Sequence, residues 1–131
     1  MIVVDTNVIS YLYLSGERSA QAERLLAHDP HWCVPVLWRS EFRSVLSLYL
    51  RKNLLTFEEV LLISEQAENL LIEHEFEVPS THIMKMVNSS SSSAYDCEFV
   101  ALAAHLGVPL VTADKKLLRE FPGIAKSLDA W

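Results

Sequence analysis

Four acidic residues stand where a carboxylate could bind a divalent cation. Asp5 and Asp114 each follow a short apolar run of the sequence. Asp96 lies at the start of an apolar helical segment, and Glu41 lies inside another. Ligand sets made of oxygen alone favour hard cations such as Mg²⁺ or Mn²⁺ over zinc. A bound ion of this kind can generate hydroxide from water for attack on a phosphodiester, and the same or a second ion can stabilise the leaving oxygen.

Two of these acids also have an ordinary structural explanation. The segment Ser93-Ala94-Tyr95-Asp96 has the pattern of a capping box, in which the first and last side chains bond to each other's backbone N–H groups. Asp114 could be the N-cap of a short helix over Lys115–Arg119. Taken singly, each acid fits a helix cap at least as well as a metal ligand.

The other two acids differ in how easily they are explained. Glu41 could form an ion pair with Arg39 or Arg43 on the same predicted helix. Asp5 directly follows an apolar strand that we expect to be buried on both faces, and burying a carboxylate is costly unless it is paired or bound to a metal. Asp5 is therefore the acid with the strongest chemical signal.

The elements that must position these acids alternate between strands and helices. Short β-branched or aromatic runs predict strands at Ile2–Val4, Trp32–Val34, Phe76–Val78 and Pro109–Thr112. Apolar residues at helical spacing predict helices over Ala20–Ala27, Val36–Arg51, Phe57–Glu73, Cys97–Leu106 and Lys115–Arg119, besides one after Asp5 that Thr6 or Asn7 could cap. Alternation of this kind predicts a three-layer α/β/α domain with a central, mainly parallel sheet of four or five strands.

Two further features of the predicted fold can be tested. The apolar positions of the predicted helix Phe57–Glu73, which we expect to form one buried face, are Phe57, Val60, Ile63, Ala67, Leu70 and Leu71. The serine run Ser89–Ser93 is expected to be a loop. In open parallel sheets, ligands bind at the carboxyl ends of the strands. We therefore expect Asp5, Asp96 and Asp114 to meet at that edge.

Composition excludes several other classes of protein. A chain of 131 residues with half its side chains apolar is long enough for one domain, residues 1–131, with its own core. Its two cysteines lack partners at zinc-binding spacing, and its three glycines form neither a Walker loop nor a dinucleotide-binding fingerprint. No apolar run approaches the length of a membrane span. We expect a protein of the cytoplasm with no membrane association.

The net charge of −6 is unevenly distributed. The segment from Glu58 to Glu77 holds seven acidic residues and no lysine or arginine, which leaves a net charge of +1 on the rest of the chain. If the four carboxylates bind cations, the remaining surface becomes more positive. A ligand with phosphate groups is then compatible with the overall charge.

Two sequence segments resemble a known family. They are VVDTNV at the start of the chain and SAYDCEFVALAAHLGVPLVTADKKL, which begins at Ser93. Together with an acid near residue 40, they are similar to the PIN-domain ribonucleases, particularly the VapC-type toxins of toxin–antitoxin pairs. The resemblance covers nearly the whole chain. It implies a PIN-like fold and an endoribonuclease that depends on Mg²⁺ or Mn²⁺.

The resemblance also implies roles for particular residues and partners. Asp5, Glu41, Asp96 and Asp114 would be the catalytic and metal-binding residues, with Thr6, Asn7, Ser93 and Thr112 as supporting polar groups. The cations near two of these acids, which could contact RNA phosphates, are Arg39, Arg43, Lys115, Lys116 and Arg119. The implied partners are an RNA substrate, a cognate antitoxin protein and a second copy of the chain. The apolar helices Val36–Leu50 and Phe57–Ile72 are the candidate surface for protein partners.

The sequence counts against two other classes of protein and leaves two related functions open. A phosphatase of the haloacid dehalogenase type would require a second aspartate where Asn7 stands, and a receiver domain would require paired acids near the start of the chain. A housekeeping PIN-domain RNA-processing nuclease would use the same four acids. A non-catalytic PIN-like binding module would not need them.

Overall fold

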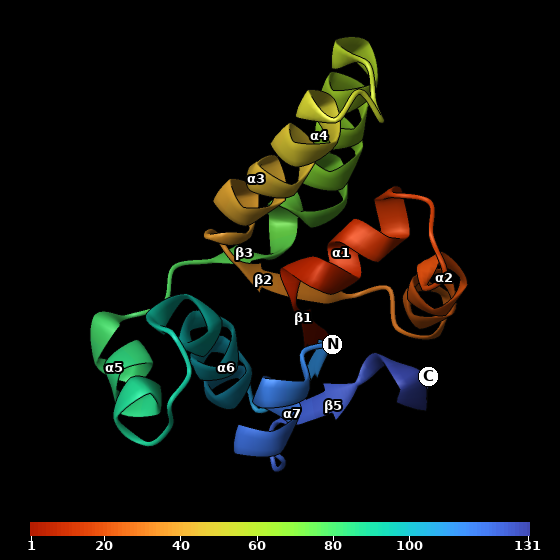
Figure 1. Ribbon diagram of the computed structural model, residues 1–131. Coiled ribbons are helices and arrows are strands. Elements are labelled where there is room, and N and C mark those ends of the chain that lie inside the picture. Colours follow the sequence, from red (N-terminus) through yellow and green to blue (C-terminus); the bar gives the residue numbers. More distant parts are fainter.

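A computed structural model describes all residues, 1–131, and contains a five-stranded sheet (Figure 1). The strands are β1 (Ile2–Val4), β2 (Trp32–Pro35), β3 (Glu75–Phe76), β4 (Leu110–Thr112) and β5 (Ala125–Ser127). Their order is β3-β2-β1-β4-β5, and every neighbouring pair is parallel. The chain builds outward from β1 in one direction and then returns to add β4 and β5 on the other side. The topological switch point lies between β1 and β4.

Helices connect and cover the strands. They are α1 (Thr6–Tyr13), α2 (Ser19–His28), α3 (Trp38–Arg51), α4 (Phe57–Leu71), α5 (Ser80–Asn88), α6 (Ala94–Leu106) and α7 (Lys115–Glu120), with short 3₁₀ turns at Ile72–His74 and Leu128–Ala130. Crossovers between parallel strands are right-handed, so α1 to α4 lie on one face of the sheet and α5 to α7 on the other. This arrangement is the three-layer α/β/α domain that the sequence predicts. The α3–α4 hairpin extends beyond the sheet (Figure 1).

The core is built from the strands and one largely apolar helix, α6. β1 and β4 are fully buried, and α6 contacts β1, β2 and β4. Six of the thirteen residues of α6 are buried, and its polar residues Asp96, Glu98 and His105 lie toward its two ends. The helix ends at Gly107, whose φ of 68° lies in the left-handed region that glycine adopts without strain.

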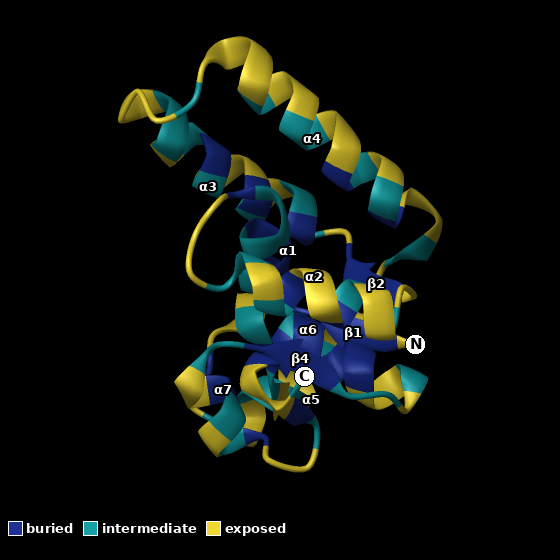
Figure 2. Ribbon diagram, turned by 90° about the vertical axis from the view of Figure 1, so that its right-hand side faces the viewer, coloured by how far each residue is buried: buried dark blue, intermediate teal, exposed yellow.

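The structure corrects several details of the predicted fold. β3 begins one residue and ends two residues earlier than expected, and α5 and β5 were not predicted as separate elements. No residue of α5 is fully buried, although Ile83, Met86 and Val87 pack against the core at helical spacing. Phe57 was expected in the core but is 60% exposed at the first turn of α4. Only Ala67 and Leu71 of that helix are fully buried, because the hairpin projects from the body of the domain (Figure 2).

One further expectation of the fold is confirmed. The serine run forms a loop between α5 and α6. None of the helices combines the length and the apolar character that crossing a membrane would require.

Candidate active site

Asp5 lies at the carboxyl end of β1 and begins α1. Its backbone N–H donates to the carbonyl of Val111 in β4, which continues the strand pairing to this point. Its Oδ1 accepts the backbone N–H of Thr6 at 2.8 Å, so Asp5 is the N-cap of α1. The expectation that Thr6 or Asn7 caps this helix is wrong, because α1 already begins at Thr6 and the Asp5 side chain accepts its N–H. The Asp5 side chain is placed at the edge of the sheet and almost fully buried.

The second oxygen of Asp5 binds a residue of the neighbouring strand. Thr112 donates its hydroxyl to Asp5 Oδ2 at 2.7 Å, and the same hydroxyl oxygen accepts the backbone N–H of Asp114 at 3.0 Å. Asn7 Nδ2 lies farther away, 3.4 Å from Asp5 Oδ2 and 3.5 Å from Thr112 Oγ1. Thr112 therefore connects two of the four acids across adjacent strands.

Glu41 reaches the same region from α3. Its Oε1 accepts the hydroxyl of Thr6 at 2.7 Å, although 35 residues separate the two in sequence. Glu41 forms no ion pair, so pairing with Arg39 or Arg43 does not explain its position. Thr6 consequently joins Asp5 through its backbone and Glu41 through its side chain.

Asp96 and Asp114 are contributed by the N-terminal ends of α6 and α7. Ser93 caps α6 by accepting the backbone N–H of Asp96 at 3.1 Å, but the reciprocal bond of a full capping box is absent. Asp114 does cap α7, because its Oδ1 accepts the N–H groups of Lys116 and Leu117 at 2.8 and 3.3 Å. The cap uses one oxygen of Asp114, and the other oxygen has no hydrogen bond within the protein.

The serine loop is tied to α7. Ser91 donates its N–H and its hydroxyl to the Glu120 carboxylate at 2.7 and 2.5 Å. Lys116 Nζ donates to the Ser91 carbonyl at 2.8 Å. These bonds hold the loop that precedes Asp96 against the helix that follows Asp114.

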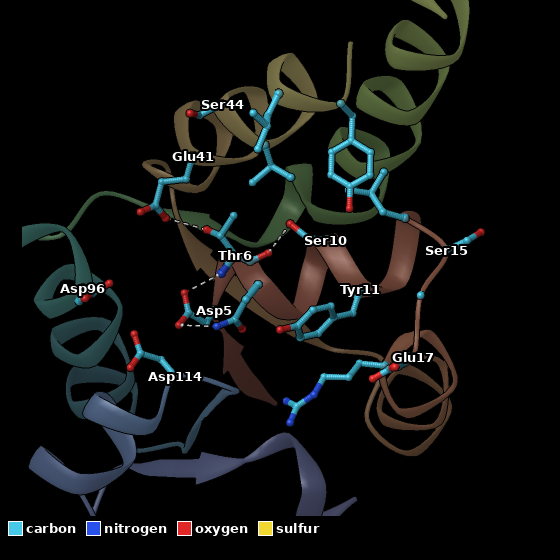
Figure 3. A pocket seen from close by; sticks show the side chains of 17 residues that line it. Asp5, Thr6, Ser10, Tyr11, Ser15, Glu17, Glu41, Ser44, Asp96 and Asp114 are labelled. Atoms are coloured by element: carbon cyan, nitrogen blue, oxygen red, sulfur yellow. Dashed lines mark hydrogen bonds between the residues drawn. The ribbon is translucent and has the colours of Figure 1, made fainter. Parts of the chain in front are cut away.

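All four predicted acids line one cavity of about 830 Å³ (Figure 3). Asp5, Glu41, Asp96 and Asp114 surround its inner end, and Figure 3 shows their side chains on three sides of a common space. No three acidic, histidine or cysteine side chains stand close enough to hold an ion in their present rotamers. Binding an ion at this end would require the carboxylates to turn toward one another.

The electrostatics of the cavity favour a positively charged ligand. Burial raises the pKa of Asp5 from 3.8 to about 6, and the nearby charges of Asp96 and Glu41 add to this rise against the hydrogen bonds from Thr112 and Thr6. Burial also raises the pKa of Glu41, with further contributions from Asp96 and Glu98. The pKa of Asp96 is raised by burial and by the charge of Asp114. A bound cation would relieve this repulsion and desolvation.

The donor chemistry of this end of the cavity fits a hard divalent cation. Every candidate ligand is a carboxylate oxygen, and both free cysteines, Cys33 and Cys97, are buried in the core. The resident polar groups Thr6, Asn7 and Thr112 position the acids. Ser93 caps α6 and is not part of the cavity wall.

The predicted cations lie in different surroundings. Arg39 makes a two-pronged contact with Glu75, at 2.7 and 2.9 Å, and a third bond to Glu68 at 2.8 Å. Lys116 is engaged by the serine loop. The five cations proposed for RNA contact, none of which lines the cavity, are Arg39, Arg43, Lys115, Lys116 and Arg119.

Sequence reasoning missed the basic residue that does line the cavity, Arg18. It lies in the short connection between α1 and α2, beside Gly16 and Glu17. Nothing in that stretch has the spacing of a recognisable motif. Only the tertiary packing of the connection places Arg18 in the wall of the cavity that the acids also line.

The fold and the four acids at the sheet edge define a class of protein. The sequence pattern of the PIN domain matches residues 2–123, and the chain belongs to the PIN domain family. It is 29% identical to Ribonuclease VapC3 from Pyrobaculum aerophilum over 126 residues, which cover 94% of this chain and 96% of that protein.

Solved structures share the fold. FitAcB from Neisseria gonorrhoeae matches over 100% of both chains with a TM-score of 0.77 and 17% identity. A chain of a toxin–antitoxin complex from Klebsiella pneumoniae matches over 98% of both chains with a TM-score of 0.70 and 15% identity. At these identities the likeness establishes the common architecture.

Proposed function

We propose that this protein is an endoribonuclease that depends on Mg²⁺ or Mn²⁺ and acts as the toxin of a toxin–antitoxin pair. The observation that carries the proposal is the convergence of Asp5, Glu41, Asp96 and Asp114 on one cavity at the switch point of the sheet. Membership in the PIN domain family and the similarity to Ribonuclease VapC3 support RNA as the substrate.

The four acids would have different roles in binding the cation. A divalent cation bound here supplies a Lewis acid and a water of lowered pKa. Asp5 and Asp96 would be the principal ligands, and Asp114 a further ligand through the oxygen that does not cap α7. Glu41, fixed by Thr6 through one oxygen, would use its other oxygen as a ligand or to orient the attacking water.

The threonines supply the positioning that this division needs. Thr112 donates to Asp5, and Thr6 donates to Glu41, so each hydroxyl stabilises the ionised form of the acid it contacts. Ionised oxygens are required for metal binding, and binding therefore weakens as the carboxylates become protonated. The buried position of Asp5 also limits access of bulk water to its oxygens.

Cleavage of total RNA by purified protein tests the proposal. The reaction is run with Mg²⁺, Mn²⁺ or EDTA, beside Asp96→Asn and the control Glu65→Gln, which changes an exposed carboxylate of α4 in the same chemical manner. We expect discrete cuts that require metal, persist in Glu65→Gln and disappear in Asp96→Asn. Metal-independent cutting, or equal cutting by Asp96→Asn, would refute the metal mechanism. No cutting by folded protein freed of any partner would refute nuclease activity on cellular RNA.

The α3–α4 hairpin is the proposed surface for the antitoxin and for a second copy of the chain. Its exposed apolar residues are Leu48, Leu54, Phe57, Leu61 and Leu62. Leu46, on the same helix as Leu48, is buried and belongs to the core. A projecting hairpin with several exposed leucines is typical of protein contact surfaces.

Light scattering and growth assays test this surface. Replacing Leu61 and Leu62 together by serine should lower the molar mass of the purified protein to that of a monomer if copies associate there. The same variant should resist growth rescue by a co-expressed antitoxin if the antitoxin binds there. If the molar mass and the growth rescue by the antitoxin are both unchanged in this variant, these contacts lie elsewhere.

A further inference from the structure

The cavity continues well beyond the four acids. From Asp5 and Glu41 it runs along α1 and α3 to the connection between α1 and α2. Its outer part is walled mainly by Tyr11, Leu14, Val45, Leu48 and Tyr49, and Glu17 contributes one carboxylate beside Arg18. An inner end with four acids therefore passes into an outer end that is mostly apolar and aromatic. Figure 3 shows Tyr11 on α1 between the acids and the connection that carries Glu17.

The outer end carries a single basic side chain. Arg18 is the one lysine or arginine in the cavity wall, and its guanidinium lies 5.7 Å from the centre of the Tyr11 ring. A cation over an aromatic face at this distance is attracted by the ring. Its other partner is Asp129, at 3.6 Å, and both of these side chains are substantially exposed. An exposed pair at that separation contributes little and is readily exchanged for another anion.

The size of the cavity fits a ligand larger than an ion. A volume of about 830 Å³ is many times the ~30 Å³ that a water molecule occupies in the liquid, and it falls within the range of small-molecule pockets. The lining adds surfaces on which a planar base can stack and a guanidinium that can bind phosphate by two hydrogen bonds. A ligand with a flat ring and two or more phosphates matches the inner and outer ends together.

We propose that Arg18, held over Tyr11, binds the phosphate of an RNA nucleotide adjacent to the bond that is cut, and that the outer cavity receives that nucleotide. The inference rests on the proposed ribonuclease function and deepens it, because it assigns a substrate-binding residue to the same site. The cation-binding inner end and the anion-binding outer end then hold successive phosphates of one strand. Tyr11 is a positioning residue that keeps the guanidinium over the cavity.

An RNA strand explains the charge pattern better than a peptide does. A strand presents the same anionic group at every step, which suits Arg18 directly and suits the acids through bound metal. A peptide would need an acidic side chain at the outer end and a basic side chain at the inner end. Peptide binding is therefore treated as a distinct outcome of the test.

Salt-dependent RNA binding and cleavage kinetics test Arg18. The probe is a fluorescein-labelled single-stranded RNA of mixed sequence, and binding is followed by anisotropy without added metal over a range of KCl concentrations. Arg18→Gln should weaken binding about tenfold and lower the slope of log K against log[KCl] by about one, because one phosphate contact is lost. Where cleavage is measured, KM should rise while kcat changes little.

Matched variants separate this contact from general effects. Arg24→Gln removes the same charge from an exposed position of α2 outside the cavity and should leave the slope and KM unchanged. Arg18→Lys should restore the slope but only part of the affinity, because an ammonium cannot form the paired hydrogen bonds. Tyr11→Leu should weaken RNA binding only when Arg18 is present. Circular dichroism melting establishes that each variant is folded.

The outcomes distinguish the two proposals. If wild-type protein cuts RNA and Arg18→Gln matches it in slope and KM, the nucleotide subsite is refuted and the ribonuclease proposal stands. If wild-type protein does not cut RNA, the ribonuclease proposal fails, while the binding slope still reports on Arg18. If RNA binding is indifferent to Arg18 but binding of a labelled oligoglutamate peptide depends on it, the outer cavity is a peptide site and the inference is overturned.

Discussion

The hydroxyl of Thr112 donates to Asp5 Oδ2 at 2.7 Å across a sequence separation of 107 residues. The same oxygen accepts the backbone N–H of Asp114. One buried hydroxyl thus sets the relation between the acid that ends β1 and the acid that follows β4. The contact is possible because β1 and β4 pair in register, with Val4 opposite Val111.

Thr112→Val tests this contact. Valine keeps the shape of threonine and removes the hydroxyl, which leaves Asp5 Oδ2 and the Asp114 N–H without this partner. We expect a loss of about 1–3 kcal/mol in the free energy of unfolding, the usual cost of an unsatisfied buried polar group. Urea unfolding measures it, and Thr81→Val at an exposed position of α5 is the control. Equal stability of the two variants would show that the hydrogen bond is unimportant.

The raised pKa of Asp5 predicts an unusual pH dependence for the metal-free protein. Its pKa is 3.8 in the unfolded reference and about 6 in the folded protein, so between these values the folded state binds more protons. Stability therefore falls as pH rises through this window, and the ionised group costs up to about 3 kcal/mol above it. In EDTA, Asp5→Asn should gain stability relative to wild type between pH 4 and pH 7. A difference between the two proteins that does not vary with pH would contradict the raised pKa.

Divalent cations should stabilise the folded protein. A ligand that binds only the folded state at 100 times its Kd adds about 2.7 kcal/mol, which corresponds to a rise of several degrees in the Tm of a domain of this size. Differential scanning calorimetry with Mn²⁺ or Mg²⁺ against EDTA measures the rise. It should be present in Glu65→Gln and lost in Asp96→Asn. A Tm that is the same with either cation as in EDTA would mean that the acids do not bind metal.

Arg39 is expected to matter for stability. Its guanidinium contacts Glu75 twice and Glu68 once, joining α3 to β3 and α4, and the Glu75 contact lowers the pKa of that carboxyl. Arg39→Gln should cost about 1–3 kcal/mol because charge-assisted hydrogen bonds are lost. Arg43→Gln is the control, because the Arg43 side chain is 63% exposed and its one acidic partner, Glu68, is at the longer distance of 3.9 Å. The sequence-based prediction that Arg39 contacts RNA would gain support if cleavage fell while stability did not.

Much of the fold follows from local sequence patterns. The buried β-branched run before Asp5 and the Ser93 cap before a largely apolar helix each predict an element whose position the structure confirms. Their signals are strong because they depend on adjacent residues. By contrast, Phe57 was misplaced because helical spacing identifies an apolar face but does not show that the α3–α4 hairpin leaves the body of the domain.

The candidate site was partly predictable for the same reason. Asp5 and Asp114 follow adjacent parallel strands, so strand order alone brings them near one another. Glu41 and Arg18 depend on how α3 and the connection after α1 pack, and no local pattern encodes that packing. The hydrogen bond from Thr6 to Glu41 is the long-range contact that fixes the position of Glu41.

The hydrogen bonds that Ser91 donates to Glu120 and accepts from Lys116 have a mechanical consequence. They clamp the loop before α6 to α7, so Asp96 and Asp114 should move as one rigid body. Glu41 lies on α3 and is linked to this part of the site through its hydrogen bond from Thr6. When a strand of substrate binds, we expect Asp96 and Asp114 to keep their spacing, while the Glu41 side chain adjusts separately.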